Sequence, residues 1–134
     1  MRAQAAFEYM VIVGIVLAFL IPVWLYVSSL QARAGEELSI SYAENAVQRI
    51  AKTADLVFSQ GSGARVQTQV YIPGGVESSA IIGRSVILNL RTGQAVSNVT
   101  ALSIATLNGT IPTSEGSYQM TMEAKTGYVQ VTAS

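Results

Sequence analysis

One uncharged apolar stretch near the N-terminus constrains this chain more than any other feature. No charged residue occurs between Glu8 and Arg33, a run of 24 residues, and positions 10–27 read MVIVGIVLAFLIPVWLYV. As a helix rising about 1.5 Å per residue, such a segment is long enough to cross the roughly 30 Å hydrocarbon core of a bilayer. Trp24 and Tyr26 lie near its far end, where amphipathic rings favour the membrane interface. The segment therefore predicts a single transmembrane helix.

A cleaved secretory signal peptide is the alternative explanation for this stretch. Signal peptides have a basic start, an apolar core of about 7–15 residues and a small-residue cleavage site after it. Here the apolar core is longer, no such site follows Tyr26, and the acidic Glu8 stands at its N-terminal edge. These departures favour a helix that is retained in the mature protein.

The composition narrows the classes of function. The chain has 134 residues, enough for one ordinary domain, and a formal net charge of zero, so no basic field indicates nucleic acid as a partner. It contains neither cysteine nor histidine, which excludes disulfides and removes the commonest metal ligand and general base. The adjacent Glu36 and Glu37 are interpreted as a solvated face. We therefore expect no enzymatic activity, no cofactor and no metal site.

One nearly continuous helix is expected from Gln4 to about Phe58. Its second half, from Leu38 onward, is amphipathic, because apolar residues recur at the spacing of one helical face. That predicted stripe consists of Ala43, Ala46, Val47, Ile50, Ala51, Ala54, Val57 and Phe58. Between the two halves, Gly35 is a candidate hinge. Within the apolar half, Pro22 predicts a kink or local unwinding.

After the helix, the pattern changes to that of β-strands. The segment QGSGA at 60–64 reads as a helix stop and linker. Alternating runs follow at 66–72, 85–90, 96–107, 119–124 and 128–132, with Lys125-Thr126-Gly127 as a hairpin turn. The predicted fold class is α+β: a long N-terminal helix, transmembrane and then amphipathic, packed on a small antiparallel sheet of about five strands.

A short motif precedes the apolar helix. Gln4-Ala5-Ala6-Phe7-Glu8-Tyr9 resembles the processing motif of archaeal type IV pilins with class III signal peptides. That pattern has Gln first, a small residue third (here Ala6), and Glu followed by Tyr or Phe at the fifth and sixth positions (here Glu8 and Tyr9). The resemblance implies that Met1-Arg2-Ala3 is a leader, removed by a membrane-embedded prepilin peptidase that cuts between Ala3 and Gln4. It also implies a type IV pilin-like fold.

The same resemblance implies a division of the chain and a location for each part. Residues 1–3 would be the leader peptide and 4–30 the transmembrane and filament-core helix, while 31–60 would continue as an amphipathic helix into a β-rich extracellular head at 61–134. The precursor would span the cell membrane once with its head outside, and the mature chain would join a surface filament. The expected partners are other copies of the chain, the peptidase, the assembly machinery and the membrane before assembly.

Glu8 is the residue with the most specific expected role. A carboxylate inside an apolar helix costs a few kcal/mol in a membrane, so it usually has a partner. Cleavage before Gln4 would create an α-ammonium group, which Glu8 of a neighbouring subunit could meet in a staggered array. The alternative is that Glu8 favours the helix N-terminus, an effect of about 0.3–1 kcal/mol. Gly14, as a close-packing point, and Pro22 complete the residues assigned to assembly.

Two functions of the same architecture remain open from the sequence. The first is a structural pilin that forms the bulk of a filament. The second is a minor pilin or a membrane-anchored surface adhesin, which differs in copy number and self-assembly. The head also contains two N-glycosylation sequons, at Asn98-Val99-Thr100 and Asn108-Gly109-Thr110.

Overall fold

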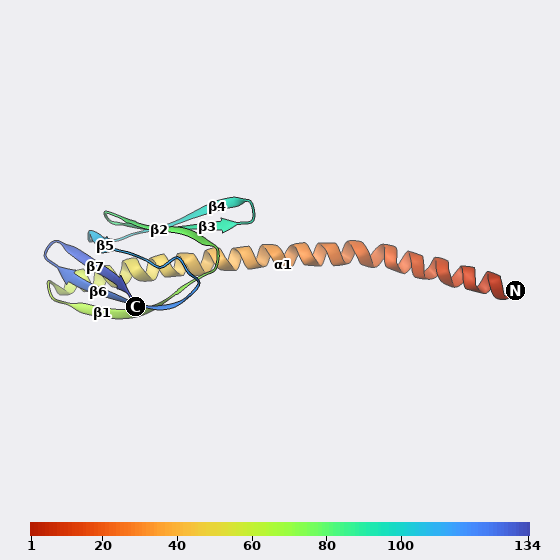
Figure 1. Cartoon of the computed structure of the whole chain (residues 1–134), viewed down its shortest axis with the longest axis horizontal. Helices are drawn as coiled ribbons and strands as arrows, with labels where there is room; N and C mark the ends of the chain where they lie inside the picture. The colour runs from red at the N-terminus through yellow and green to blue at the C-terminus, as the bar shows by residue number, and fades with distance from the viewer. The chain divides into compact units, whose positions relative to one another are not determined.

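The computed structural model describes all 134 residues and contains one helix and seven strands (Figure 1). The elements are α1 (Arg2–Gln60), β1 (Arg65–Ile72), β2 (Val76–Ile82), β3 (Ser85–Thr92), β4 (Ala95–Leu102), β5 (Leu107–Gly109), β6 (Gly116–Lys125) and β7 (Tyr128–Ala133). The chain divides into two compact units, an N-terminal unit of Met1–Gly35 and a head unit of Glu36–Ser134. The class is α+β, as the sequence predicts.

Helix α1 is uninterrupted, which corrects the expectation of unwinding at Pro22. Every residue from Arg2 to Gln60 is helical, Pro22 included. A proline removes one backbone hydrogen bond but fixes φ in the helical range, so the flanking turns continue the helix. The helix also extends two residues beyond each predicted end. The division between the two units falls directly after Gly35, although the backbone there stays helical.

The head contains two sheets, so the predicted single antiparallel sheet is wrong in detail. The first sheet has the strand order β1-β6-β7-β5, and the second has the order β2-β3-β4. One pair, β5 with β7, is parallel, with Leu107 opposite Val129. The predicted strand at 96–107 divides into β4 and β5: Ser103 N–H still donates to Arg84 O in the register of the β3–β4 ladder, and beyond it the chain turns away, with Ile104 N bonded to Asp55. The sequence reading also missed β2, whose register shifts between Val76 and Ser78.

Gly109 combines a backbone conformation and a close backbone contact that only glycine allows. Its φ is +144°, outside the range that side chains favour, and it pairs with Val131 in the parallel ladder. A Cβ atom added at Gly109 would lie 1.9 Å from Val131 O. The hairpin turn predicted at Lys125-Thr126-Gly127 is confirmed, with Lys125 opposite Tyr128 and Gly127 at φ +87°.

The core of the head forms around the second half of α1. Seven of the eight residues in the predicted stripe are buried, and only Phe58, 40% exposed, is not. The buried stripe belongs to one core cluster with residues of both sheets. From the first sheet come Val70, Ile72, Leu107, Met120, Met122, Ala124, Val129 and Val131, and from the second Val86, Leu88, Leu90, Val99 and Ala101. Packing the helix stripe against two sheets covers the apolar surface of all three elements.

A polar contact fixes the chain between β4 and β5 to the helix. Asp55 Oδ1 accepts hydrogen bonds from Ser103 Oγ and from Ile104 N, the latter at 2.9 Å. Ser103 Oγ in turn accepts a hydrogen bond from Ala105 N at 3.1 Å. Because Ser103 is buried, these bonds satisfy groups that would otherwise be left unpaired away from water.

Candidate functional site

The residues of the predicted processing motif lie on the first turns of α1. Ala3, Gln4, Ala6, Glu8 and Tyr9 are all helical and exposed. The Ala3–Gln4 peptide bond lies in the first turn of the helix, and Glu8 lies in the second. The two ion pairs of the chain, Arg91–Glu77 and Lys125–Glu123, leave Glu8 without a charged partner.

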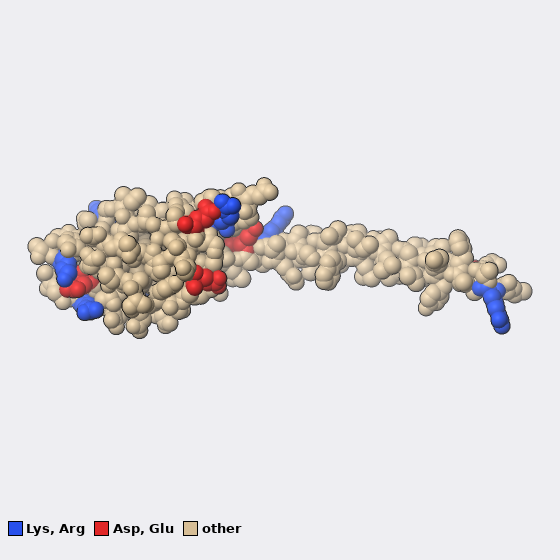
Figure 2. Space-filling view, in the orientation of Figure 1, with Lys and Arg blue, Asp and Glu red and all other residues tan.

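The apolar segment is exposed on every side. None of the residues from Arg2 to Leu38 is buried, and its large apolar side chains keep at least 42% of their surface accessible. The helix contains an 18-residue window with a mean hydropathy of 2.7, long and apolar enough by composition to cross a membrane. In Figure 2 one face of this segment carries no charged atoms along most of its length. An N-terminal helix that is apolar all round is compatible with membrane anchoring.

Gly14 and Pro22 contact nothing that explains their presence within a single chain. A Cβ atom at Gly14 would meet no atom within 4 Å, and Pro22 is exposed. Glycine costs about 1 kcal/mol relative to alanine inside a helix. Neither residue is therefore required by the packing of the chain on its own.

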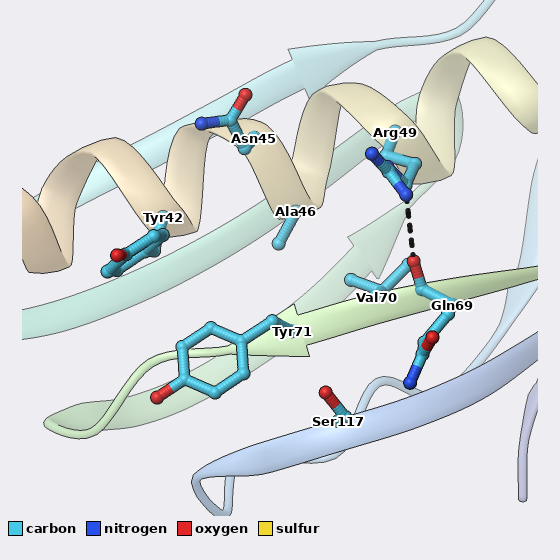
Figure 3. A pocket seen from close by; sticks show the side chains of 8 residues that line it. All are labelled: Tyr42, Asn45, Ala46, Arg49, Gln69, Val70, Tyr71 and Ser117. Atoms are coloured by element: carbon cyan, nitrogen blue, oxygen red, sulfur yellow. Dashed lines mark hydrogen bonds between the residues drawn. The ribbon is translucent and has the colours of Figure 1, made fainter.

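The head carries an open pocket of about 310 Å³, which the sequence did not predict (Figure 3). Its polar and aromatic lining comes from Tyr42, Asn45 and Arg49 of α1, Gln69 and Tyr71 of β1, and Ser117 of β6. The rings of Tyr42 and Tyr71 meet edge to face, with centroids 5.5 Å apart. Arg49 Nη1 donates a hydrogen bond to Gln69 O at 3.2 Å. Residues from different elements of this lining lie 20 or more positions apart in the sequence, so only the fold brings them together.

Tyr71 has a carboxylate partner outside the pocket. Its hydroxyl donates a hydrogen bond to Glu115 Oε1 at 3.0 Å. This bond, followed by partial desolvation and the nearby negative charge, raises the pKa of Tyr71 above its ordinary value of 10.0. The phenol therefore stays protonated and acts as a hydrogen-bond donor. A raised pKa is the opposite of what an activated nucleophile or base requires.

The two sequons lie on different sheets and in different surroundings. Asn98, on β4, is exposed but bonded: its Nδ2 donates to Asn89 Oδ1 at 2.9 Å, and its Oδ1 accepts from Thr100 Oγ1 at 2.7 Å. Asn108, on β5, is also exposed. Both side chains are accessible at the head surface.

The structure contains no cluster of three or more residues that could hold a metal ion. Glu36 and Glu37 are exposed, and a Cβ atom at Gly93, in the turn between β3 and β4, would lie 3.1 Å from Glu36 Oε1. The start of the head unit thus lies against this turn. The fold and the surface together define an α+β head carried on an N-terminal helix compatible with a membrane.

Comparison with models of protein families finds no match for this chain. Comparisons with characterised proteins and with solved structures find no match either.

Proposed function

We propose that this chain is the structural subunit, or pilin, of an archaeal type IV pilus-like surface filament. A prepilin peptidase removes residues 1–3, and the subunit assembles through its N-terminal helix with the head outward. Support comes first from the motif Gln4–Tyr9, which stands directly before the apolar helix.

One structural observation carries the proposal. The head unit has a complete core of its own, while the apolar surface of residues 10–27 is covered by nothing in the chain. Such a surface requires an apolar surrounding on all sides. Lipid supplies it before assembly, and the corresponding helices of other copies supply it afterwards.

The unpaired carboxylate of Glu8 supports the same proposal. A charged group in an apolar helix bundle is costly unless it is paired. Cleavage before Gln4 creates an α-ammonium group four residues from Glu8 in the sequence. In a staggered bundle, Glu8 of one subunit pairs with this ammonium on its neighbour, and the pairing selects the axial register.

Processing is tested by measuring the N-terminus of the chain recovered from the surface of the native cells. The proposed function predicts a mature protein that begins at Gln4. A chain that still begins at Met1, or one that begins beyond Tyr26, contradicts the assignment.

Assembly is tested by comparing Glu8→Ala and Glu8→Gln with Glu37→Gln, which removes an exposed carboxylate at the start of the head unit. Both Glu8 variants should insert into the membrane at normal or higher levels, because removal of the charge makes insertion less costly. Sheared filament should fall at least tenfold in both, whereas Glu37→Gln should leave it unchanged. Normal filament yield in both Glu8 variants would leave Glu8 with only a helix-terminus role. Native filaments that contain the chain only as a trace component would favour the minor pilin or adhesin.

A further inference from the structure

Strand β4 forms a free edge of the second sheet. Its neighbour β3 pairs with it along all eight residues on one side, and no strand lies on the other side. In an antiparallel sheet, backbone N–H and C=O groups point alternately to the two sides of a strand. The outer side of β4 therefore presents a row of backbone groups that another strand could pair with.

The other sheet edges are blocked, whereas β4 is not. On β1, Arg49 of the helix bonds the backbone carbonyl of Gln69, and Arg65 adds a charge. Strand β2 has an irregular register and lies near β5, and β5 itself has only three residues. By contrast β4, with the sequence AVSNVTAL, has no charge, no proline and no irregularity in its pairing. Charges, bulges and short strands are the usual protection of an edge, and β4 has none of them.

The exposed face of β4 has a symmetric pattern. Val99 and Ala101 point into the core, so Val96, Asn98, Thr100 and Leu102 share the outer face. Val96 and Leu102 are 55% and 74% exposed, one at each end of the strand. The two polar residues lie between them.

We propose that β4 pairs antiparallel with β4 of a second copy of this chain, with Val99 opposite Val99. This register places Val96 of each copy opposite Leu102 of the other, and Asn98 opposite Thr100. Two three-stranded sheets then join into one of six strands. The neighbouring registers that keep the same faces together would centre on residue 98 or 100 instead of Val99. In each of them, an apolar end residue lies opposite a polar residue or beyond the end of the partner strand. The pattern therefore favours the register centred on Val99.

The direction of β4 determines how the two copies are oriented. The strand begins next to the turn that lies against Glu36 and ends beside Ser103, which is bonded to Asp55. Strand β4 therefore runs in the same direction as the head half of α1. Because the proposed pairing is antiparallel, the head halves of the two helices run in opposite directions.

This orientation identifies where the contact forms, a step that rests on the proposed function. Subunits of one filament all point the same way, so the pairing joins heads of different filaments that run in opposite senses. One eight-residue edge buries less surface than a stable standard interface. Repeated along two filaments, however, many such contacts act together. The surface thus suits lateral adhesion between filaments.

The register is tested in detergent with the full chain, which has no native cysteine. One preparation carries Val96→Cys and another carries Leu102→Cys. Opposed side chains lie about 5 Å apart at Cβ, close enough for a disulfide, whereas two copies of the same variant hold their sulfurs roughly 20 Å apart. With dissolved oxygen and a copper catalyst as the oxidant, the mixture should form disulfide-linked dimer at least tenfold faster than either variant alone. Equal rates in the mixture and in the single variants would overturn the proposed pairing.

A charge exchange provides a second test, with Asn98→Cys and Thr100→Cys chains as the cross-linking pair. Val96→Glu or Leu102→Lys, added to both chains, should slow cross-linking at least tenfold. Combining both charges should restore the rate to within about threefold, because each introduced carboxylate then faces an introduced ammonium. The carboxylate introduced by Val96→Glu would lie opposite Arg91 of the same head. Because the two charges are opposite in sign, this substitution should not disturb folding. Ile82→Glu, an equally exposed site on β2, should have no effect. Failure of the combined variant to recover would contradict the register.

The outcomes separate this inference from the proposed function. Cross-linking in detergent needs no filament, so a positive result supports the β4 pairing even if Glu8 proves irrelevant to assembly. Filaments that depend on Glu8, combined with no selective cross-link, would overturn the pairing and leave the pilin proposal intact.

Discussion

The two halves of α1 share one helix but differ completely in what covers them. In the N-terminal unit, no residue is buried, although most residues from 10 to 27 are apolar. In the head unit, the same helix buries seven residues on one stripe, and its other residues are half-buried or exposed. The number of apolar residues does not explain the difference; their distribution around the helix does. A stripe directs a helix onto a sheet of its own chain, whereas an apolar surface on all sides requires other molecules.

The largest difference is expected between the two units when they are produced as separate fragments. The fragment Glu36–Ser134 contains the whole core, so it should remain soluble and unfold in one cooperative transition. The peptide Met1–Gly35 should sediment, or bind to lipid vesicles or detergent micelles. Circular dichroism during heating and a vesicle flotation assay would measure both. A head fragment without a cooperative transition would show that the units depend on each other.

The second largest effect is expected from replacing isoleucine by alanine, which should destabilise the head when made in one half of α1 and not in the other. Ile50 is fully buried, so Ile50→Ala should lower the free energy of unfolding of the head by about 2–5 kcal/mol. Ile15 is 54% exposed in the N-terminal unit, and Ile15→Ala should leave head unfolding unchanged. Chemical denaturation of the full chain in detergent, followed by near-ultraviolet circular dichroism of its packed aromatic rings, would compare the two. Equal losses would mean that the apolar half also packs on the head.

Within the head, two glycines should differ although both have positive φ. Gly109→Ala introduces a Cβ atom against Val131 O and should destabilise the head by about 3 kcal/mol or more. Gly127→Ala meets no atom within 4 Å and should cost only about 1 kcal/mol, the backbone penalty. Thermal unfolding of the two variants would measure the difference. Similar losses would indicate that the parallel β5–β7 contact is looser than described.

The smallest expected effect concerns an exposed side chain of the head. Because Glu115 raises the pKa of Tyr71, the folded state favours the neutral phenol. This contribution to stability is present below pH 10 and is lost as the pH rises through the raised pKa of the folded state. Ultraviolet difference titration should show a late ionisation that Tyr71→Phe removes, and Glu115→Gln should move the pKa of Tyr71 back toward its ordinary value. No change with Glu115→Gln would exclude the hydrogen bond as the cause.

The sequence predicts those features that repeat along the chain. Periodicity located the helix and all but one residue of its buried stripe, because a helical face repeats locally. Alternation located β1 and β7, and glycine marked the turn at Gly127. The apolar segment was evident from length and charge alone. Each of these signals can be recognised within a window of about twenty-five residues or fewer.

Features that depend on distant contacts could not be predicted. The division into two sheets depends on where the chain leaves β4, and at that point Ser103 is bonded to Arg84 and Asp55, 19 and 48 positions away. The pocket likewise joins Tyr42 to Tyr71 across two elements. The proposed processing motif is a separate case: its residues are exposed, so no contact within the chain bears on the role proposed for them.

The strand order also determines which sheet of the head can form first during synthesis. The β2-β3-β4 meander connects neighbouring segments through short turns, so it can close early. The first sheet cannot form early, because β1 pairs with β6 some 50 residues later in the chain. Strand β5 likewise pairs with Val131 and its neighbours in β7, which is the last strand to be synthesised. At a synthesis rate of about 5–20 residues per second, the apolar helix emerges roughly 5–20 s before the last strand. During that interval the stripe on α1 lacks the cover of the first sheet, so the core of the head can be complete only after β7 has been synthesised.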